Sequence, residues 1–413
     1  MKNKYKLTAL VVALSLGITA CGNEAEQKVD DAKTQVEESA EDAKTSVDEK
    51  ANEAEDKVEE AKDDAEDKVE EAKDEAEEKI EEAEEEASEE IEDAKEEMSD
   101  EDFAAAIEGK LVLRRSLKAP HGEGSFARVS VVTDGDKIVD ATIDEIQYFD
   151  EDAGFEALPN QDEDTDFKAG NAEGKILGSK VMNDEKYSEM MTEKAESTVS
   201  IWDNYVAIEE FAMGKTIDEL KEVVEGAEDG KPIDAVTGAT LVDTKGYLEA
   251  IIETAESRDN VSIFEAENID DIIVQQIYGT AGAKNAITDT FVVLENGKII
   301  AANIDEYQYI EGKGVPNSDN KFGENFADSE KKLASKLENN EEYSKLMNDK
   351  AEATNKLDEN FKAIQDFVVG KTPEEIKEVI DNNENGTPVD AVSGATLTNT
   401  VGYLEEIYNA ATK

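Results

Sequence analysis

The sequence is organised around a phrase that occurs twice, Asp234-Ala-Val-Thr-Gly-Ala-Thr240 and Asp390-Ala-Val-Ser-Gly-Ala-Thr396. Each copy follows a Gly-x-Pro step, and the proline favours an extended approach, so a short strand is expected over residues 233–236. Apolar residues spaced for one helical face follow, and they predict a helix over residues 241–255. The last threonine of each phrase would then lie near a helix N-terminus, where free N–H groups and the helix dipole favour a phosphate.

The phrase Asp-x-x-(Ser/Thr)-Gly-Ala-Thr resembles the flavinylation motif of the bacterial FMN-binding domain family, which includes the covalent-flavin subunits of sodium-pumping quinone reductases. In that family a flavin transferase attaches FMN to the last threonine through a phosphoester bond. The resemblance therefore implies two covalent FMN groups per chain, on Thr240 and Thr396. It also implies cofactor-binding roles for the other motif residues, which are Asp234, Thr237, Gly238 and Ala239 in the first copy and Asp390, Ser393, Gly394 and Ala395 in the second. The alternative is an ordinary strand–turn–helix in which the small residues serve packing.

The first twenty residues have the pattern of a targeting segment. Three lysines precede an apolar run over residues 7–18, and Ile18-Thr-Ala-Cys21 closes it. This pattern resembles a bacterial lipoprotein signal, which implies cleavage after residue 20 and a lipid on Cys21. The alternatives are an ordinary secretory signal or a transmembrane helix, although the apolar run is short for a membrane span. Cys21 is the only cysteine, so no thiol remains for disulfides, iron–sulfur clusters or haem attachment.

The composition is strongly acidic, with 104 Asp and Glu residues against 43 Lys and Arg and a net charge of −61. Such a chain would be repelled by a phosphate backbone, which excludes nucleic acid as a partner. Residues 24–100 are rich in Glu, Ala, Lys and Asp, and their larger apolar residues recur every eleven positions, at Val36, Val47, Val58, Val69, Ile80 and Ile91. An eleven-residue period is close to that of a straight helix. We expect residues 21–101 to form a lipid-anchored helical stalk, which acts either as a spacer or as a helix that self-associates.

The remainder of the chain reads as an internal repeat, with one copy over residues 106–259 and a second over residues 265–413. Each copy begins with two β-rich segments around Asp134-Gly135 or Asn296-Gly297, which predicts a β-hairpin. Helices are expected next, near residues 187–213 and 343–369 and again through Val224 and Ile380. Antiparallel strands followed by helices predict an α+β fold of two repeated FMN-binding domains. Residues 260–272 are expected to be the linker and the approach to the second copy.

Several other residues could carry chemistry. Lys215 and Lys371 each follow a glycine, but the glycine spacing of a phosphate loop is missing, and Gly-Lys-Thr followed by acids favours a helix cap. His121, the only histidine, is expected in a loop, with a flavin contact as the alternative. Tyr148 and Tyr309 recur at equivalent places and could stack on a flavin or pack in the core, whereas packing is expected for Trp202. No metal site and no catalytic residue is expected.

These observations favour an electron carrier over a stand-alone enzyme, because chemistry without a visible nucleophile or metal must come from a cofactor. The order of lipid anchor, acidic segment and paired domains resembles the two-domain flavin lipoproteins of Gram-positive extracellular electron transfer. That resemblance implies a location on the outer face of the cell membrane and three kinds of partner: a flavin transferase, a quinone-linked membrane dehydrogenase, and external acceptors such as ferric iron. Two alternatives remain open, a surface spacer or signalling lipoprotein that releases a peptide from its signal sequence, and an extracellular flavin-dependent reductase.

Overall fold

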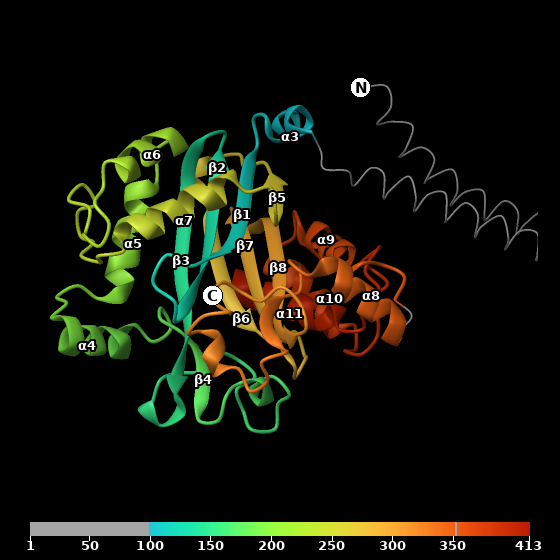
Figure 1. The fold of residues 1–413 in the computed structure, drawn as a ribbon. Helices are drawn as coiled ribbons and strands as arrows, with labels where there is room; N and C mark the ends of the chain where they lie inside the picture. The colour runs from blue at the N-terminus through green and yellow to red at the C-terminus, as the bar shows by residue number, and fades with distance from the viewer. Residues whose placement is uncertain (1–98, 352) are drawn as a thin grey trace, which may run out of the picture. The chain divides into compact units, whose positions relative to one another are not determined.

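The computed structural model describes residues 99–351 and 353–413 (Figure 1). Cys21, the predicted signal peptide and nearly all of the predicted stalk lie outside the described residues. By its contacts the chain divides into residues 1–103 and residues 104–413. The second unit contains all the described strands, and the helix α3 (Asp100–Ile107) precedes its first strand.

The first sheet is antiparallel and has the order β4-β3-β2-β1-β5. Its strands are β1 (Leu111–Lys118), β2 (Ser125–Asp134), β3 (Lys137–Asp150), β4 (Lys175–Ser179) and β5 (Val261–Phe264). The hairpin predicted around Asp134-Gly135 is confirmed as the β2–β3 turn, in which Asp134 pairs with Lys137. Gly135 takes a φ of 60° there, a conformation that glycine adopts without steric cost.

The second sheet is also antiparallel and has the order β6-β7-β8-β9. Its strands are β6 (Ile273–Gly279), β7 (Ala286–Glu295), β8 (Lys298–Ile310) and β9 (Lys332–Ser335). The second predicted hairpin is confirmed as the β7–β8 turn at Asn296-Gly297. Both turn residues have positive φ, as the tight hairpin turn requires.

Two groups of helices follow the strands in the chain. The first group is α4 (Asp184–Ala195), α5 (Ile201–Ala212), α6 (Ile217–Glu225) and α7 (Thr244–Glu256); the second is α8 (Asn340–Ala351), α9 (Leu357–Val368), α10 (Pro373–Asp381) and α11 (Thr400–Ala411). The predicted α+β class is confirmed by this combination of antiparallel sheets and helices. Thr216 and Thr372 cap α6 and α10 in capping boxes with Glu219 and Glu375, which confirms the cap interpretation of the Gly-Lys-Thr steps.

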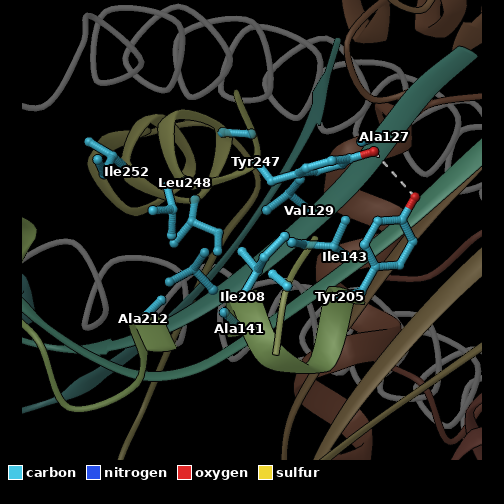
Figure 2. Close-up of a cluster of buried hydrophobic side chains, with 14 of the residues drawn as sticks. Ala127, Val129, Ala141, Ile143, Tyr205, Ile208, Ala212, Tyr247, Leu248 and Ile252 are labelled. Atoms are coloured by element: carbon cyan, nitrogen blue, oxygen red, sulfur yellow. Dashed lines mark hydrogen bonds between the residues drawn. The ribbon is translucent and has the colours of Figure 1, made fainter. Parts of the chain in front are cut away.

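Each sheet buries one face against its own helices. Val129 and Ile143 of the first sheet pack against Ile208 of α5 and Leu248 of α7 (Figure 2). An equivalent core joins Val292 and Ile304 of the second sheet to α9 and α11. Alternate residues of each strand point to opposite faces, so the other faces of the two sheets remain to be covered.

Those other faces pack against each other. Apolar clusters at the two ends of this interface contain residues from both sheets. The same interface contains buried ion pairs. Arg128 pairs with Asp289 at 3.1 Å, and Arg115 pairs with both Asp289 and Asp305 at 3.1 Å each. The hydroxyls of Tyr148 and Tyr309 contact each other in the same interface, so both rings serve the core rather than an exposed stacking surface.

One loop from each half reaches across this interface and forms hydrogen bonds with the other half. The side-chain amide of Asn160 donates to the carbonyls of Ala283 and Ala286, at 2.7 Å each. Asn317 donates in the opposite direction, to the carbonyls of Gly122 and Ser125, at 2.9 and 2.7 Å. Each loop therefore binds the backbone of the other half at the start of β7 or of β2.

Three expectations were wrong in their local detail. The segment expected as a linker contains β5, which pairs with β1, because its Val-Ser-Ile-Phe run fits the strand edge beside it. Residues 233–236 form a turn rather than a strand, since the Val236 N–H donates to the nearby Ile233 carbonyl at 2.9 Å. Trp202 is 46% exposed on the first turn of α5 and does not pack in the core.

Candidate functional site

The two motif loops connect α6 to α7 and α10 to α11. In each loop a valine and an alanine, three residues apart, are buried: Val236 and Ala239 in the first, Val392 and Ala395 in the second. The remaining motif residues are exposed, namely Asp234, Ala235, Thr237, Gly238 and Thr240 in the first loop and Asp390, Ala391, Ser393, Gly394 and Thr396 in the second. In each loop the buried valine and alanine thus hold the turns against the core. The predicted attachment threonine of each loop is left exposed to solvent.

In each loop the backbone conformation at the motif glycine favours that residue. Gly238 has a φ of 103° and Gly394 a φ of 91°, a region that L side chains rarely adopt. A Cβ at these positions would also lie 3.2 Å from the Cβ of Ala207 on α5, and 3.3 Å from that of Ala363 on α9. Glycine therefore lets each loop lie directly on its helix.

A buried asparagine anchors each attachment threonine. Asn204 of α5 accepts a hydrogen bond from the backbone N–H of Thr240 at 2.6 Å and from its hydroxyl at 3.3 Å. Asn360 of α9 accepts the same two bonds from Thr396, at 2.7 and 3.1 Å. Both asparagine side chains are fully buried, and each donates its own amide hydrogens to carbonyls at the start of its helix. Each hydroxyl is thereby held in one place while its lone pairs stay accessible.

The chemistry of this anchor limits what the chain can do alone. An asparagine oxygen accepts a proton in a hydrogen bond but does not remove it, so it orients the hydroxyl without activating it. Within residues 99–351 and 353–413, neither attachment hydroxyl bonds to a titratable side chain. The asparagines therefore position these oxygens but supply no base.

The helices that follow the two motifs differ from the others in charge. Helices α7 and α11 have no acid in their first turn. By contrast α4, α5, α6, α8, α9 and α10 each carry one or two acids there. A first turn without acids beside an exposed threonine suits a phosphate, although α7 carries Asp243 at its N-cap where α11 has the neutral Asn399. The helices begin at Thr244 and Thr400, four residues past each threonine, so the predicted helix start at 241 was too early.

The Gly-Tyr-Leu run after each motif joins the helix to the core. Tyr247 and Leu248 are buried, and the hydroxyl of Tyr247 lies 3.4 Å from that of Tyr205 on α5 (Figure 2). Gly246 lets the loop between β1 and β2 approach, because a Cβ there would lie 2.5 Å from the Pro120 carbonyl oxygen. As a result His121 of that loop reaches Asp243, with its Nδ1 2.6 Å from the carboxylate.

A buried ion pair lies below each motif. Lys180 pairs with Glu145, which also accepts a hydrogen bond from Tyr205 at 3.1 Å. Lys336 pairs with Glu306 at 2.6 Å in the second half. Burial opposes both charges, but the partner charge prevails, so the pKa of Glu145 is lowered and those of Lys180 and Lys336 are raised. The Lys180–Glu145 pair therefore stays ionised, and Lys336 stays charged beside Glu306.

The described residues were also compared with the requirements of a metal site and of a membrane-spanning helix. Among residues 99–351 and 353–413, no group of three or more His, Cys, Asp or Glu side chains could hold a metal ion. Over that range, too, no helix has the length and apolar character needed to cross a membrane. The chain was compared with protein-family models, curated proteins and solved structures, and no match was found.

Sequence reasoning missed Asn204 and Asn360. Each precedes its attachment threonine by 36 residues, and each stands between an acid and an aromatic residue. That equal spacing within the repeat was the available signal. It was not decisive, because a polar residue on an amphipathic helix is more often solvent-facing.

Proposed function

We propose that the chain is a membrane-anchored extracellular electron-transfer flavoprotein that carries FMN covalently on Thr240 and Thr396. In this proposal residues 106–259 and 265–413 are two copies of an FMN-binding domain, held away from the membrane by the stalk and the lipid on Cys21. The supporting observation is an exposed threonine whose hydroxyl is bonded to a buried asparagine and which is followed by a helix without acids in its first turn, and this arrangement occurs twice. That the attached group is FMN is inferred from the resemblance of the motif to the flavinylation motif.

The attachment would exchange the Oγ–H bond of each threonine for an Oγ–P bond. An activated flavin nucleotide would provide the phosphorus and release its leaving group, and the hydroxyl proton would pass to a base. Because Asn204 and Asn360 cannot act as that base, we assign it to the flavin transferase. The exposure of both hydroxyls leaves room for such an enzyme to reach them.

Bound FMN would supply reversible uptake of electrons, which the side chains of this chain do not offer. The role of the protein would be to hold the group and to keep it at the cell surface. By resemblance, the electrons would come from a quinone-linked membrane dehydrogenase and would leave to external acceptors such as ferric iron.

The reductase alternative has one observation in its favour. A groove of about 890 Å³ lies between β1, β5, β8 and α9, and it includes the buried Asn303, whose Oδ1 has no hydrogen-bond partner among the described residues. However, the groove is lined by Lys362 and Asp366 of α9, whereas Asn360 and Ala363 of the same helix face the Thr396 loop. The groove and the attachment site therefore use different faces of the helix, which favours a carrier without its own substrate pocket.

The proposal is tested by removing each hydroxyl in turn. The wild type, Thr240→Val, Thr396→Val and the double variant would be coexpressed with a flavin transferase, denatured, and compared by flavin fluorescence in a gel. Each single variant should keep about half of the signal and the double variant none. Thr398→Val is the matched control, because Thr398 is exposed in the same loop.

A single variant that lost the whole signal, or a double variant that kept it, would defeat the assignment of the two threonines. A wild type that stayed colourless with an active transferase would favour the surface spacer or signalling lipoprotein.

A further inference from the structure

The loop between β1 and β2 is seated on the start of α7. Gly246 permits the contact, and it places the His121 ring beside Asp243, at 2.6 Å between Nδ1 and the carboxylate. Asp243 is the N-cap residue of α7 and lies three residues after Thr240. His121 is therefore held next to the first attachment loop by a carboxylate.

The second half keeps the loop contact but not the charges. A Cβ on Gly402 would clash with the Ala281 carbonyl, as one on Gly246 would with Pro120. Gly282 stands in the place of His121, and Asn399 in the place of Asp243 as the N-cap of α11. The two attachment sites are thus alike in backbone, but only the first has an ionisable pair at this contact.

The charges around His121 come from three elements. Asp243 faces it from α7, and Glu145 from β3 is close enough for His121 to lower its pKa. Glu145 is already paired with Lys180, while Glu123 in the same loop pairs with Lys321. Further along the motif loop and helix, Lys231 and Lys245 pair with Glu228 and Asp229.

A carboxylate at the position of Asp243 would repel a phosphodiester on Thr240 unless a cation compensated for it. His121 is suited to this role, because its Nδ1 is turned to the carboxylate and histidine is the side-chain type that can carry a positive charge near physiological pH. The neutral Asn399 needs no such partner, which accounts for the glycine at position 282.

We propose that His121 is the positioning residue that faces the phosphate on Thr240, and that it makes the first attachment site responsive to pH while the second is not. This inference rests on the proposed function, since it requires a phosphate at Thr240. It concerns the charge state of His121 and can therefore be measured without any assay of electron transfer.

The chain has a single histidine, so its ring protons give one proton NMR titration curve. The curve would be recorded for the full protein without flavin, for Thr396→Val loaded at Thr240 alone, and for Thr240→Val loaded at Thr396 alone, with the loading verified by mass. Loading Thr240 should raise the midpoint by roughly 0.3 to 1 pH unit, because a negative phosphate stabilises the imidazolium. Loading Thr396 should leave the midpoint unchanged.

A further measurement separates a charge effect from a structural one. The shift caused by loading Thr240 should shrink in 0.5 M salt, since both groups are accessible to solvent.

An unchanged midpoint after loading at Thr240, or an equal rise after loading at Thr396, would overturn the inference while leaving the proposed function intact. Absence of any mass adduct would instead overturn the proposed function and this inference with it.

Discussion

At the scale of single residues, the two attachment loops depend on groups that are buried rather than on the exposed motif. Asn204 and Asn360 each satisfy the backbone and the hydroxyl of one threonine and also close the start of their own helix. Removing a buried hydrogen-bonding group costs more than the bond itself is worth, because its partners are left unsatisfied.

We therefore predict that Asn360→Ala lowers the free energy of unfolding by about 1–3 kcal/mol. It should also reduce flavin attachment at Thr396 and leave Thr240 unaffected, because the two loops have separate anchors. Urea unfolding and the masses of the tryptic peptides measure the two effects. The exposed neighbour Lys362 provides a control as Lys362→Ala, and equal loss at both threonines would contradict the prediction.

Glu209 in the first half and Gln365 in the second occupy equivalent positions, but only Glu209 can ionise. Burial raises the pKa of Glu209 to about 8 and that of Asp140 to about 7, and the Glu209 carboxylate accepts the backbone N–H of Ile143 at 2.6 Å. Gln365 accepts the equivalent bond from Ile304 in the second half, at 3.3 Å. A neutral side chain thus serves in the same place, which fits a protonated Glu209 at neutral pH.

A carboxyl group whose pKa is raised on folding gives stability that is complete below the unfolded value and is lost as pH rises through the folded value. Between pH 6 and 9 the wild type should lose about 1–3 kcal/mol of stability relative to Glu209→Gln. Denaturant unfolding across this range measures the difference, with the exposed Glu210→Gln as control. Parallel curves for the wild type and Glu209→Gln would show that Glu209 is ionised in the folded protein.

At the scale of elements, the features that were predictable are those fixed within a few residues. The hairpin turns depend on Gly135 and on Asn296-Gly297, and the caps of α6 and α10 depend on Thr216 and Thr372. Strand β5 was not predictable, since its partner β1 lies about 150 residues earlier in the chain and nothing local marks the pairing. The turn at residues 233–236 was missed because proline favours an extended approach but does not provide a strand partner.

The capping box of α10 gives a prediction at this scale. Thr372→Ala should lower the free energy of unfolding by about 1 kcal/mol, because the Glu375 N–H loses its acceptor. Flavin attachment should not change, since the cap is outside the motif loop. Thermal unfolding measures the loss, Thr372→Ser should recover most of it, and a loss equal to that of Thr372→Ala in the Ser variant would contradict the capping role.

At the scale of the whole unit, the repeat reads as two domains, yet residues 104–413 form one compact unit. The buried charges Arg115, Arg128, Asp289 and Asp305 and the loops of Asn160 and Asn317 join the halves. This interface could not be predicted from the sequence, because a buried arginine and an exposed one look alike in the chain. The repeated motif could be recognised, since six of its seven residues are identical in the two copies, but flavin attachment to its threonines stays a prediction.

The joined halves should unfold together. Trp202, the only tryptophan, lies in the first half, so its fluorescence reports that half while circular dichroism reports both. We predict coincident urea transitions for the two signals. We also predict that Asp289→Asn lowers the common midpoint and reduces the free energy of unfolding by about 3–5 kcal/mol, because two arginines lose a buried partner. Two separate transitions in the wild type would show that the halves are independent.

The central claim is that each of two threonines carries one covalent flavin, and the intact mass of the protein tests it most directly. The protein would be produced with and without a flavin transferase and weighed under denaturing conditions. The account predicts a mass increase of two FMN phosphoester adducts with the transferase and none without it, with peptide masses that place one adduct on Thr240 and one on Thr396. An unchanged mass with an active transferase, or adducts on other residues, would contradict it.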